Sequence, residues 1–365
     1  MTLYVNGRFL TQPLSGVQRY ARELLGAFDT LLAQDPQPVE VLAPHPVTVP
    51  DWRVLRVRVV RGGQGHLWEQ GALARAAQGG TLLSLGNSGP LWHRDHVLCL
   101  HDANLYEIPE AFAFRYRVAH RLLRPRLARR ARLLLTVSRH SAQALSHHLG
   151  VPAARFHILS NSAEHVLRWP ARADVPAQYG LTSGGYLLTV GNQSPNKNVA
   201  ALIAAHGQAG EAVPPLVCVG GAVSGVAATG LGRSSRVRLL GRVPDADLRG
   251  LYEGAAGFVF PSLYEGFGIP PLEAMQLGVP VLCARSGAMP EVLGQGPQWF
   301  DPRDETDMVA ALQRFARLSQ TDREAMRVMG RAVAAQYRWR GTAERLQGVV
   351  LGHVQARPPS RASVV

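Results

Sequence analysis

The segment Glu265–Glu273 reads Glu-Gly-Phe-Gly-Ile-Pro-Pro-Leu-Glu, so that two carboxylates eight residues apart flank a glycine-rich turn. Residues 255–262, just before it, include a short apolar run that ends at a proline, which is typical of a buried parallel strand. Pro270 and Pro271 favour the first turn of a helix, because the N–H that proline lacks has no intrahelical partner there. The order of strand, glycine turn and helix predicts one unit of a parallel α/β sheet.

The same turn has the chemistry of an anion site. Glycines let backbone amides approach a ligand, and the start of a helix presents unpaired N–H groups and the positive end of its dipole. Glu265 and Glu273 repel an anion but accept hydrogen bonds from sugar hydroxyls, so the segment predicts a sugar joined to phosphate. An ordinary capped helix with two solvated glutamates would have the same local pattern. The prolines restrict the amide donors to those of Gly266, Phe267, Gly268 and Ile269.

A second turn carries the single lysine of the chain. An apolar run at 187–190 leads into Gly191 and Asn192, and Lys197 follows at the predicted start of a helix. Of the 39 basic residues, 39 − 1 = 38 are arginine, so a position that holds lysine is informative. If this turn lies beside residues 266–269, Lys197 and the amides form a cationic site for a diphosphate leaving group, and stabilising such charge is usually the largest catalytic contribution. A surface lysine at a helix start is the simpler alternative.

Two weaker signals follow apolar runs in the N-terminal half. Gly16 lets the backbone approach a ligand, and Ser15 is expected to cap the helix that begins there. His101 and Asp102 follow the apolar run 96–100, where the imidazole could bind a sugar hydroxyl or carry a proton. Both patterns are common, and the polar pair could simply cap the next element.

Short apolar runs alternate with helical patterns along the chain, which predicts parallel sheets with helices on both faces. The pattern restarts after a stretch rich in Pro, Ala and Gly at 168–183, so we expect two domains, with ligands at the carboxyl ends of the strands. Expected strands cover 3–5, 39–42, 54–60, 81–85, 96–100, 133–137, 186–190, 216–219, 237–240, 257–260 and 280–283, and expected helices of the first half cover 17–28, 66–77, 111–130 and 140–149.

Composition narrows the class of protein. At 365 residues and 46% apolar content, the chain can bury the cores of about two domains. It has no signal-peptide pattern and no apolar run near the roughly 18 residues of a membrane span. The three cysteines lie inside apolar runs, as reduced core residues do. We therefore expect a cytoplasmic protein.

The formal charge of +13 is concentrated in one stretch. Residues 111–163 contain ten arginines and no Asp or Glu, and most of these arginines lie in Arg115–Arg132. Such a stretch could make peripheral contact with an anionic membrane at its inner face, or attract a phosphate-bearing acceptor or nucleic acid. A solvated arginine face is at least as consistent with the pattern, because Arg stems also cover apolar surface.

Asp245 and Asp247 match the Asp-x-Asp signature by which some sugar transferases hold a divalent metal. Here the pair enters an amphipathic helix, where acidic residues complement the helix dipole and Asp245 is expected to cap. No other acidic cluster supports a metal in the sequence, and the lysine and amides already serve the phosphates. We expect neither a metal nor another cofactor.

Taken together, the turn with glutamates spaced as Glu265 and Glu273, the 191–198 loop and the Gly16 loop resemble the retaining glycosyltransferases of family 4, which have the GT-B fold of two Rossmann-like doubly wound domains facing a cleft. The likeness covers nearly the whole chain and is strongest over 236–293, and residues 6–23 are similar to mannosyltransferase-like members. It implies an acceptor-binding domain at 1–170 that a crossing helix at 338–355 rejoins, and a donor-binding domain at 171–337. The tail 356–365 is expected to be disordered.

The resemblance also implies roles for individual residues. Glu265 would contact the donor sugar, Glu273 the ribose and His101 the transferred sugar. Many members place an arginine a few residues before the lysine, where this chain has residues 192–194, so Lys197 would carry more of the charge or an arginine elsewhere would assist. The implied catalytic residues are His101, Lys197 and Glu265, with Asp102 on the acceptor and Gly16, Asn192, Lys197, Gly241, Arg242, Val243, Glu265, Gly266, Phe267, Gly268, Ile269 and Glu273 on the donor.

The activity implied is transfer of a hexose, mannose in preference to others, from a nucleotide sugar such as GDP-mannose or a UDP-sugar to a saccharide or lipid-linked saccharide, as in polysaccharide biosynthesis. Retention of anomeric configuration and independence of metal are part of that expectation. Two alternatives stay open. One is a non-catalytic nucleic-acid or membrane-surface binding protein that uses the arginine stretch, and the other is an enzyme of the same fold that releases or epimerises the sugar.

Overall fold

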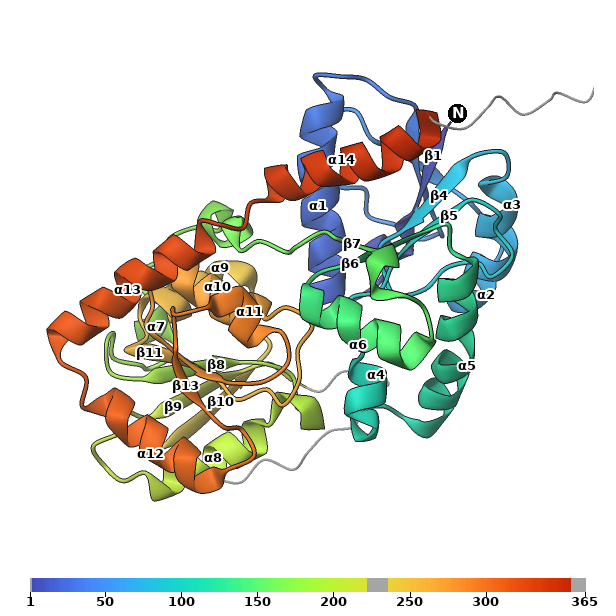
Figure 1. The fold of residues 1–365 in the computed structure, drawn as a ribbon. Helices are drawn as coiled ribbons and strands as arrows, with labels where there is room; N and C mark the ends of the chain where they lie inside the picture. Colours follow the sequence, from blue (N-terminus) through green and yellow to red (C-terminus); the bar gives the residue numbers. More distant parts are fainter. Residues whose placement is uncertain (1, 222–235, 356–365) are drawn as a thin grey trace, which may run out of the picture.

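The computed structural model describes residues 2–221 and 236–355, and in them the chain forms two parallel β-sheets flanked by helices (Figure 1). The first sheet has the order β3-β2-β1-β4-β5-β6-β7 and the second the order β10-β9-β8-β11-β12-β13. All neighbouring strands are parallel. The predicted fold class, two Rossmann-like doubly wound domains, is confirmed.

The first sheet and its helices come from the N-terminal half of the chain. Its strands are β1 (Leu3–Asn6), β2 (Val39–Ala43), β3 (Arg56–Val59), β4 (Thr81–Ser84), β5 (His96–Cys99), β6 (Leu133–Thr136) and β7 (Phe156–Ile158). Its helices are α1 (Gly16–Leu32), α2 (Gly65–Trp68), α3 (Ala74–Ala76), α4 (Asn104–Glu107), α5 (Phe114–Arg130) and α6 (Arg139–Leu149).

The second sheet begins after a connecting segment that contains the short helix α7 (Val175–Gln178). Its strands are β8 (Leu187–Val190), β9 (Leu216–Val219), β10 (Val237–Gly241), β11 (Gly257–Phe260), β12 (Val281–Ala284) and β13 (Gln298–Phe300). The helices are α8 (Val199–Gln208), α9 (Asp245–Glu253), α10 (Ile269–Gln276), α11 (Met289–Leu293), α12 (Glu305–Ala316), α13 (Gln320–Ala334) and α14 (Trp339–Gln355).

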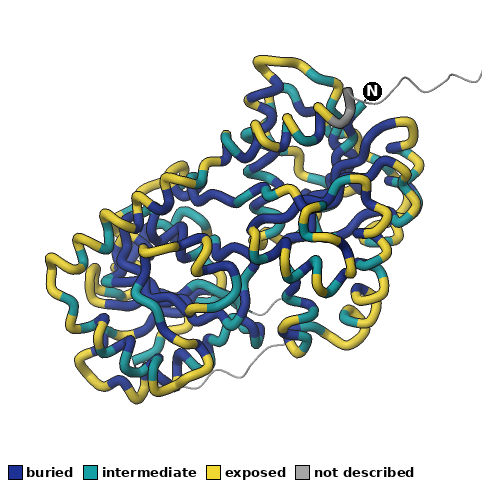
Figure 2. Tube along the Cα trace, viewed as in Figure 1, coloured by how far each residue is buried: buried dark blue, intermediate teal, exposed yellow. Residues whose placement is uncertain are grey.

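Burial accounts for the apolar runs of the central strands. The central strands β4, β5, β9, β11 and β12 are buried along their whole length, as Figure 2 shows, and each reads as a continuous apolar run or nearly so. The prediction missed β7 and β13, which are the last strands of their sheets. Each has three residues, and His157 and Gln298 are not buried, so neither strand shows the apolar run of a central strand.

One helix prediction is confirmed with a local irregularity, and one needs correction. Residues 65–76 are helical, as expected over 66–77, but Glu69–Leu73 form a π-helical turn between α2 and α3. The helix expected from Ala111 begins at Phe114 instead, since Pro109–Ala111 form a 3-10 helix and Phe112 is extended.

The C-terminal helix α14 returns to the first domain, where it crosses α1 and packs against it (Figure 1). Trp339, at its start, is buried and packs edge-on against Tyr20 of α1, with ring centroids 5.9 Å apart. One apolar core therefore includes side chains from both ends of the chain. The tail predicted to be disordered, 356–365, lies outside the described residues.

Candidate active site

A cavity of about 410 Å³, which we call the interdomain cavity, opens where the carboxyl ends of the two sheets face each other. Loops that follow β1 and β5 form one wall, and loops that follow β8 and β11 form the other. These are the edges at which open α/β sheets bind ligands. The predicted site residues in its lining are Gly16, His101, Asp102, Asn192, Lys197, Glu265, Gly266, Phe267, Gly268, Ile269 and Glu273.

Lys197 and Glu265 form an ion pair in this cavity. The Lys197 Nζ lies 2.5 Å from Glu265 Oε1, and 19% and 16% of the two side chains are exposed, so both remain accessible from the cavity. The ammonium also lies 5.5 Å from the centre of the Phe260 ring. The two turns that are separate in the sequence therefore meet, and the two charges are paired.

The turn before α10 presents free backbone donors. Gly268 occupies the N-cap position with φ 95°, a left-handed conformation that favours glycine. The amides of Gly266, Phe267 and Gly268 donate to no acceptor within residues 2–221 and 236–355. These amides, at a helix N-terminus near the Lys197 ammonium, make the arrangement that binds phosphate groups.

Gly266 is required for a reason other than ligand approach. A Cβ at this position would lie 2.5 Å from the His101 carbonyl oxygen and 2.8 Å from Asp102 Cβ, both in the first domain. The Gly266 carbonyl in turn accepts hydrogen bonds from the hydroxyls of Ser138 (2.7 Å) and Ser141 (3.1 Å). The sequence interpretation, that this glycine admits a ligand, was incomplete, because the residue admits the backbone of the other domain.

Glu273 is buried and already holds two hydrogen bonds. Its Oε1 lies 2.7 Å from His165 Nε2, and its Oε2 accepts a hydrogen bond of 2.9 Å from the Tyr252 hydroxyl. Burial acts to raise the pKa of Glu273, but the hydrogen bond from His165, together with the electrostatic interactions with His165 and Arg19, outweighs burial and lowers the pKa. The carboxylate is therefore ionised and keeps lone pairs that can accept further hydrogen bonds, and its contact with a ribose stays a prediction.

His101 is buried, and its ring orientation is fixed. Nε2 lies 2.8 Å from the Leu85 carbonyl oxygen, which can only accept, so Nε2 carries the hydrogen and Nδ1 is left as an acceptor. The backbone N–H donates to Asn87 Oδ1 at 2.8 Å. Burial lowers the pKa of His101, which keeps the ring neutral. Both roles that the sequence left open for His101, binding of a sugar hydroxyl and proton transfer, stay predictions.

Three residues that line the cavity have partners of their own. Asp102 Oδ1 accepts a hydrogen bond from the Asn104 N–H at 3.0 Å in the turn before α4, whose N-cap residue is Ala103 without a side-chain cap. Asn192 Oδ1 accepts from the Ser194 hydroxyl at 2.5 Å and holds its loop. Ser15 stands at the N-cap position of α1, but its hydroxyl donates to Gln18 Oε1, so the expected side-chain cap was wrong.

Arg19, which the sequence interpretation missed, also lines the cavity. Its guanidinium makes two hydrogen bonds across the domains to Asp245, at 3.0 and 2.8 Å, and lies over the Trp169 ring at 5.0 Å. The N-cap of α9 is Pro244, so the prediction that Asp245 caps this helix was wrong. The position of Arg19, one helical turn after Gly16, could have marked it as a residue near the ligand. Nothing in that position indicates that its partner lies in the other domain.

Asp247 is also engaged, by Arg172 at 2.9 Å and by the Tyr179 hydroxyl at 2.9 Å. Within the part of the chain that the structure describes, no group of three or more His, Cys, Asp or Glu side chains could hold a metal ion. The carboxylates of the Asp-x-Asp pattern thus connect protein segments.

Gly241, Arg242 and Val243, predicted to meet the base, are not in the lining of the interdomain cavity. Gly241 ends β10 with φ 68°, and Arg242 Nη2 donates to the Leu14 carbonyl at 3.0 Å, which joins the two domains beside the cavity. Their contact with a base stays a prediction.

Comparison with known proteins gives consistent results. A family model described as "Glycosyl transferases group 1" matches residues 184–317. The O-antigen chain mannosyltransferase B of Escherichia coli is 35% identical over 272 residues, which cover 69% of this chain and 70% of that protein. A sucrose-phosphate synthase from Thermosynechococcus elongatus has a similar structure, with a TM-score of 0.74 at 16% identity over 98% of this chain and 99% of that one. The Anabaena protein HepE, in complex with UDP and glucose, has a TM-score of 0.69 at 20% identity over 98% and 99% of the two chains.

Proposed function

Because the chain belongs to the group 1 glycosyl transferases, we propose that it transfers mannose from a nucleotide diphosphate sugar to a saccharide or lipid-linked saccharide. The fold is GT-B, and the protein is a glycosyltransferase. Mannose as the sugar, a saccharide as the acceptor, and a retaining mechanism without a metal are the parts that we propose.

One observation carries the proposal, the ion pair of Lys197 and Glu265 beside unpaired turn amides. An arriving diphosphate would accept hydrogen bonds from the amides and from the Lys197 ammonium. Glu265 would then be released to accept a hydrogen bond from the sugar. Binding would thus replace the ion pair between Lys197 and Glu265 by contacts of Lys197 with phosphate and of Glu265 with hydroxyl groups. A molecule that joins phosphate to a hydroxyl-bearing ring makes both kinds of contact.

The proposed reaction needs no nucleophile from the protein. The acceptor hydroxyl attacks the anomeric carbon on the face from which the diphosphate departs, the glycosidic carbon–oxygen bond forms as the carbon–phosphate oxygen bond breaks, and the departing diphosphate takes the hydroxyl proton. Lys197 and the amides stabilise the negative charge that develops on the diphosphate. The acceptor nitrogen Nδ1 of His101 would bind a hydroxyl of the transferred sugar.

Two observations support the finer choices. Mannose is favoured because the E. coli relative at 35% identity is described as an O-antigen chain mannosyltransferase, which also favours a polysaccharide acceptor. Independence of metal is supported by Lys197 and the amides, which supply the positive charge that a metal would otherwise provide, and by the pairing of Asp245 with Arg19 and Asp247 with Arg172.

A thermal-shift screen with GDP, UDP and ADP and their sugars tests the donor. We expect GDP-mannose to raise the melting temperature, and the same donor to turn over with a mannose-terminated acceptor in the presence of EDTA. NMR of the product would show whether the α configuration of the donor sugar is kept. Inversion, or activity that EDTA abolishes, would overturn the mechanism, and protection by no nucleotide sugar would overturn the function.

The arginine stretch supports a second proposal, peripheral contact with an anionic membrane. Helix α5 carries arginines beside exposed apolar side chains, among them Phe114 (68% exposed) and Leu122 (57% exposed). No helix within the described ranges has both the length and the apolar character to cross a bilayer. Co-sedimentation with vesicles that contain phosphatidylglycerol, compared with phosphatidylcholine vesicles and with RNA, tests this contact. Salt-sensitive binding to RNA, with none to vesicles and no donor turnover, would instead favour the nucleic-acid alternative.

A further inference from the structure

A second cavity, of about 290 Å³, opens on the first domain, and we call it the Arg8 cavity. It lies at the edge of the sheet where β1, β2 and β3 end, and its lining comes from the segments that follow these strands. The same edge of the sheet forms one wall of the interdomain cavity. Its volume is near the lower end of the range for small-ligand sites. Its lining is largely polar and consists of Arg8, Thr11, Gln12, His45, Pro46, Gln64 and Gly65.

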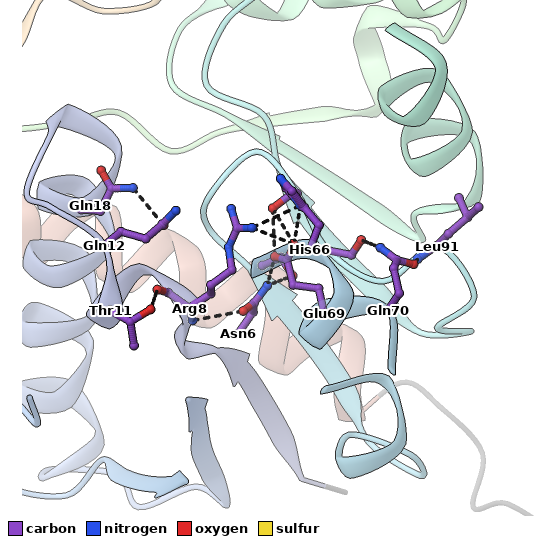
Figure 3. Close-up of polar contacts among 12 residues, drawn as sticks. Asn6, Arg8, Thr11, Gln12, Gln18, His66, Glu69, Gln70 and Leu91 are labelled. Atoms are coloured by element: carbon purple, nitrogen blue, oxygen red, sulfur yellow. Dashed lines mark hydrogen bonds and ion pairs between the residues drawn. The ribbon is translucent and has the colours of Figure 1, made fainter. Parts of the chain in front are cut away.

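Arg8 is held in place by a fully buried carboxylate, Glu69, as Figure 3 shows. Glu69 Oε2 lies 3.2 Å from Arg8 Nη1 and 2.8 Å from His66 Nδ1. Glu69 Oε1 accepts hydrogen bonds from Asn6 Nδ2 at 2.8 Å and from the Ser88 hydroxyl at 2.9 Å. Glu69 begins the π-helical turn, and such turns are frequent at functional sites. The position of the Arg8 guanidinium is therefore fixed, and Glu69 balances its charge.

The groups around the Arg8 cavity have unused hydrogen-bonding capacity of both kinds. Gln64 donates to the His45 carbonyl at 3.3 Å, which leaves its Oε1 to accept. Gln12 accepts from Gln18 at 3.1 Å, as Figure 3 shows, which leaves its NH₂ group to donate. Arg8 Nε and Nη2 have no hydrogen-bond partner among the residues that the structure describes.

This combination selects a class of ligand. A hydroxyl group both donates and accepts, so a ring that carries several hydroxyls can pair with amide oxygens, amide NH₂ groups and guanidinium N–H groups together. An anion is a poorer match, because Glu69 already balances the charge of Arg8 and the Gln64 oxygen would repel it. The lining thus fits a neutral, polyhydroxylated ligand.

The Arg8 cavity lies close to the interdomain cavity. Gln12 lines the first and Leu14 the second, and these two residues are at most about 7 Å apart along the chain. One extended ligand can therefore occupy both cavities by crossing residues 12–15.

We propose that the Arg8 cavity binds a sugar unit of the saccharide acceptor other than the one that is glycosylated. The proposal rests on the proposed function, because it takes the interdomain cavity as the place of transfer. It assigns a subsite that would make the enzyme prefer an oligosaccharide to a single sugar, and it assigns Gln12, Gln64 and Arg8 to the recognition of hydroxyl groups.

Calorimetric binding and steady-state kinetics with α-linked mannotriose and methyl α-mannoside test the subsite. We expect the wild-type protein to prefer the trisaccharide, and the double variant Gln12→Ala/Gln64→Ala to lose about tenfold of that preference, as expected for the loss of one or two hydrogen bonds. Gln336→Ala, a change of an exposed glutamine on the second domain, is the matched control and should keep the preference.

Arg8→Met is a second variant, which removes the guanidinium donors but also leaves Glu69 with one partner fewer. The melting temperature of Arg8→Met is measured first. If this variant is unfolded, the double variant Gln12→Ala/Gln64→Ala alone tests the subsite. Equal preference for the trisaccharide in the wild type and the double variant, or no preference in the wild type, would overturn the subsite. Failure of the proposed function would give a different result from failure of the subsite. In that case, the wild-type protein would neither transfer mannose from GDP-mannose to either acceptor nor hydrolyse the donor.

Discussion

The two walls of the interdomain cavity hold their polar groups in different ways. On the first-domain wall, His101 is fixed by Leu85 and Asn87, and Arg19 by Asp245 and Trp169. On the second-domain wall, the Lys197 ammonium pairs with Glu265, and the turn amides have no described acceptor.

This difference separates two tasks. Groups that are already fixed lose little freedom when a ligand binds and so set its position, whereas charges that can exchange partners respond to a charged ligand. The first wall is therefore suited to orientation and the second to the stabilisation of charge. Glu273 and Asn192 are exceptions on the second wall, because His165 and Tyr252 hold Glu273 and Ser194 holds Asn192.

The largest effect is expected from Lys197→Ala. The change removes the ammonium that would stabilise the departing diphosphate, so kcat should fall by about 10²–10³-fold. Lys197→Arg keeps a positive charge and should keep part of the activity. Steady-state kinetics with the nucleotide sugar are the measurement. Equal turnover of wild type and Lys197→Ala would show that the second wall does not carry the charge.

A smaller but still large effect is expected from Gly266→Ala, which places a methyl group against the His101 carbonyl. The two walls would then be held apart, and a misplacement of about 1 Å can cost about 10²-fold in rate. Small-angle scattering should report a more open molecule while each domain stays folded. Gly207→Ala, at a glycine that, like Gly266, has no positive φ but has open space around it, controls for glycine replacement as such. Unchanged kcat in Gly266→Ala would mean that the contact is unnecessary for transfer.

The pH dependence of donor binding should reveal the role of His165. The pKa of Glu273 is lowered in the folded protein, so its ionised form is fully present above the ordinary carboxyl value and is lost only as the pH falls through the lowered pKa. The KM for the donor should therefore be flat between about pH 8 and 5 in the wild type.

In His165→Phe, burial would dominate and raise the pKa of Glu273, so the donor KM should rise as the pH falls, by about tenfold for each unit below the new pKa. His165→Gln restores an N–H donor and should restore the flat profile. A KM that rises equally in both variants at every pH would assign His165 a merely structural role.

The smallest effect is expected from Asp245→Asn, which weakens the pair with Arg19. The Asp245 side chain is 38% exposed, so the loss in the free energy of unfolding should be only about 0.5–1 kcal/mol. Chemical denaturation measures it, and Glu324→Gln, which breaks a surface pair within α13, is the control. A loss several times larger would show that the walls are joined mainly by this pair.

Much of the fold follows from local pattern, and part of the site does not. Apolar runs mark the central strands, because strands buried on both faces need apolar side chains throughout. The turns of Lys197 and Glu265 follow two of those strands, which is why their proximity could be predicted. Arg19 and His165 escaped notice because their partners lie 226 and 108 residues away, and no local spacing encodes such a contact.

The reason why a position holds glycine can also be misjudged. Gly266 fits the pattern of a ligand-binding turn, yet its missing side chain leaves room for the His101 carbonyl. A glycine in such a turn indicates that another group approaches the backbone closely. Only the tertiary structure identifies that group.

The lone lysine gives this protein an unusual chemical property. Since Lys197 is the single lysine in the sequence and its ammonium borders the interdomain cavity, an amine-selective reagent has one side-chain target, apart from the N-terminal amine. A fluorophore or crosslinker of that kind would be delivered to the cavity without any engineered residue. The rate at which Lys197 is labelled can be followed by mass spectrometry in the presence of candidate nucleotide sugars. A decrease in this rate would measure directly how much of the interdomain cavity is occupied.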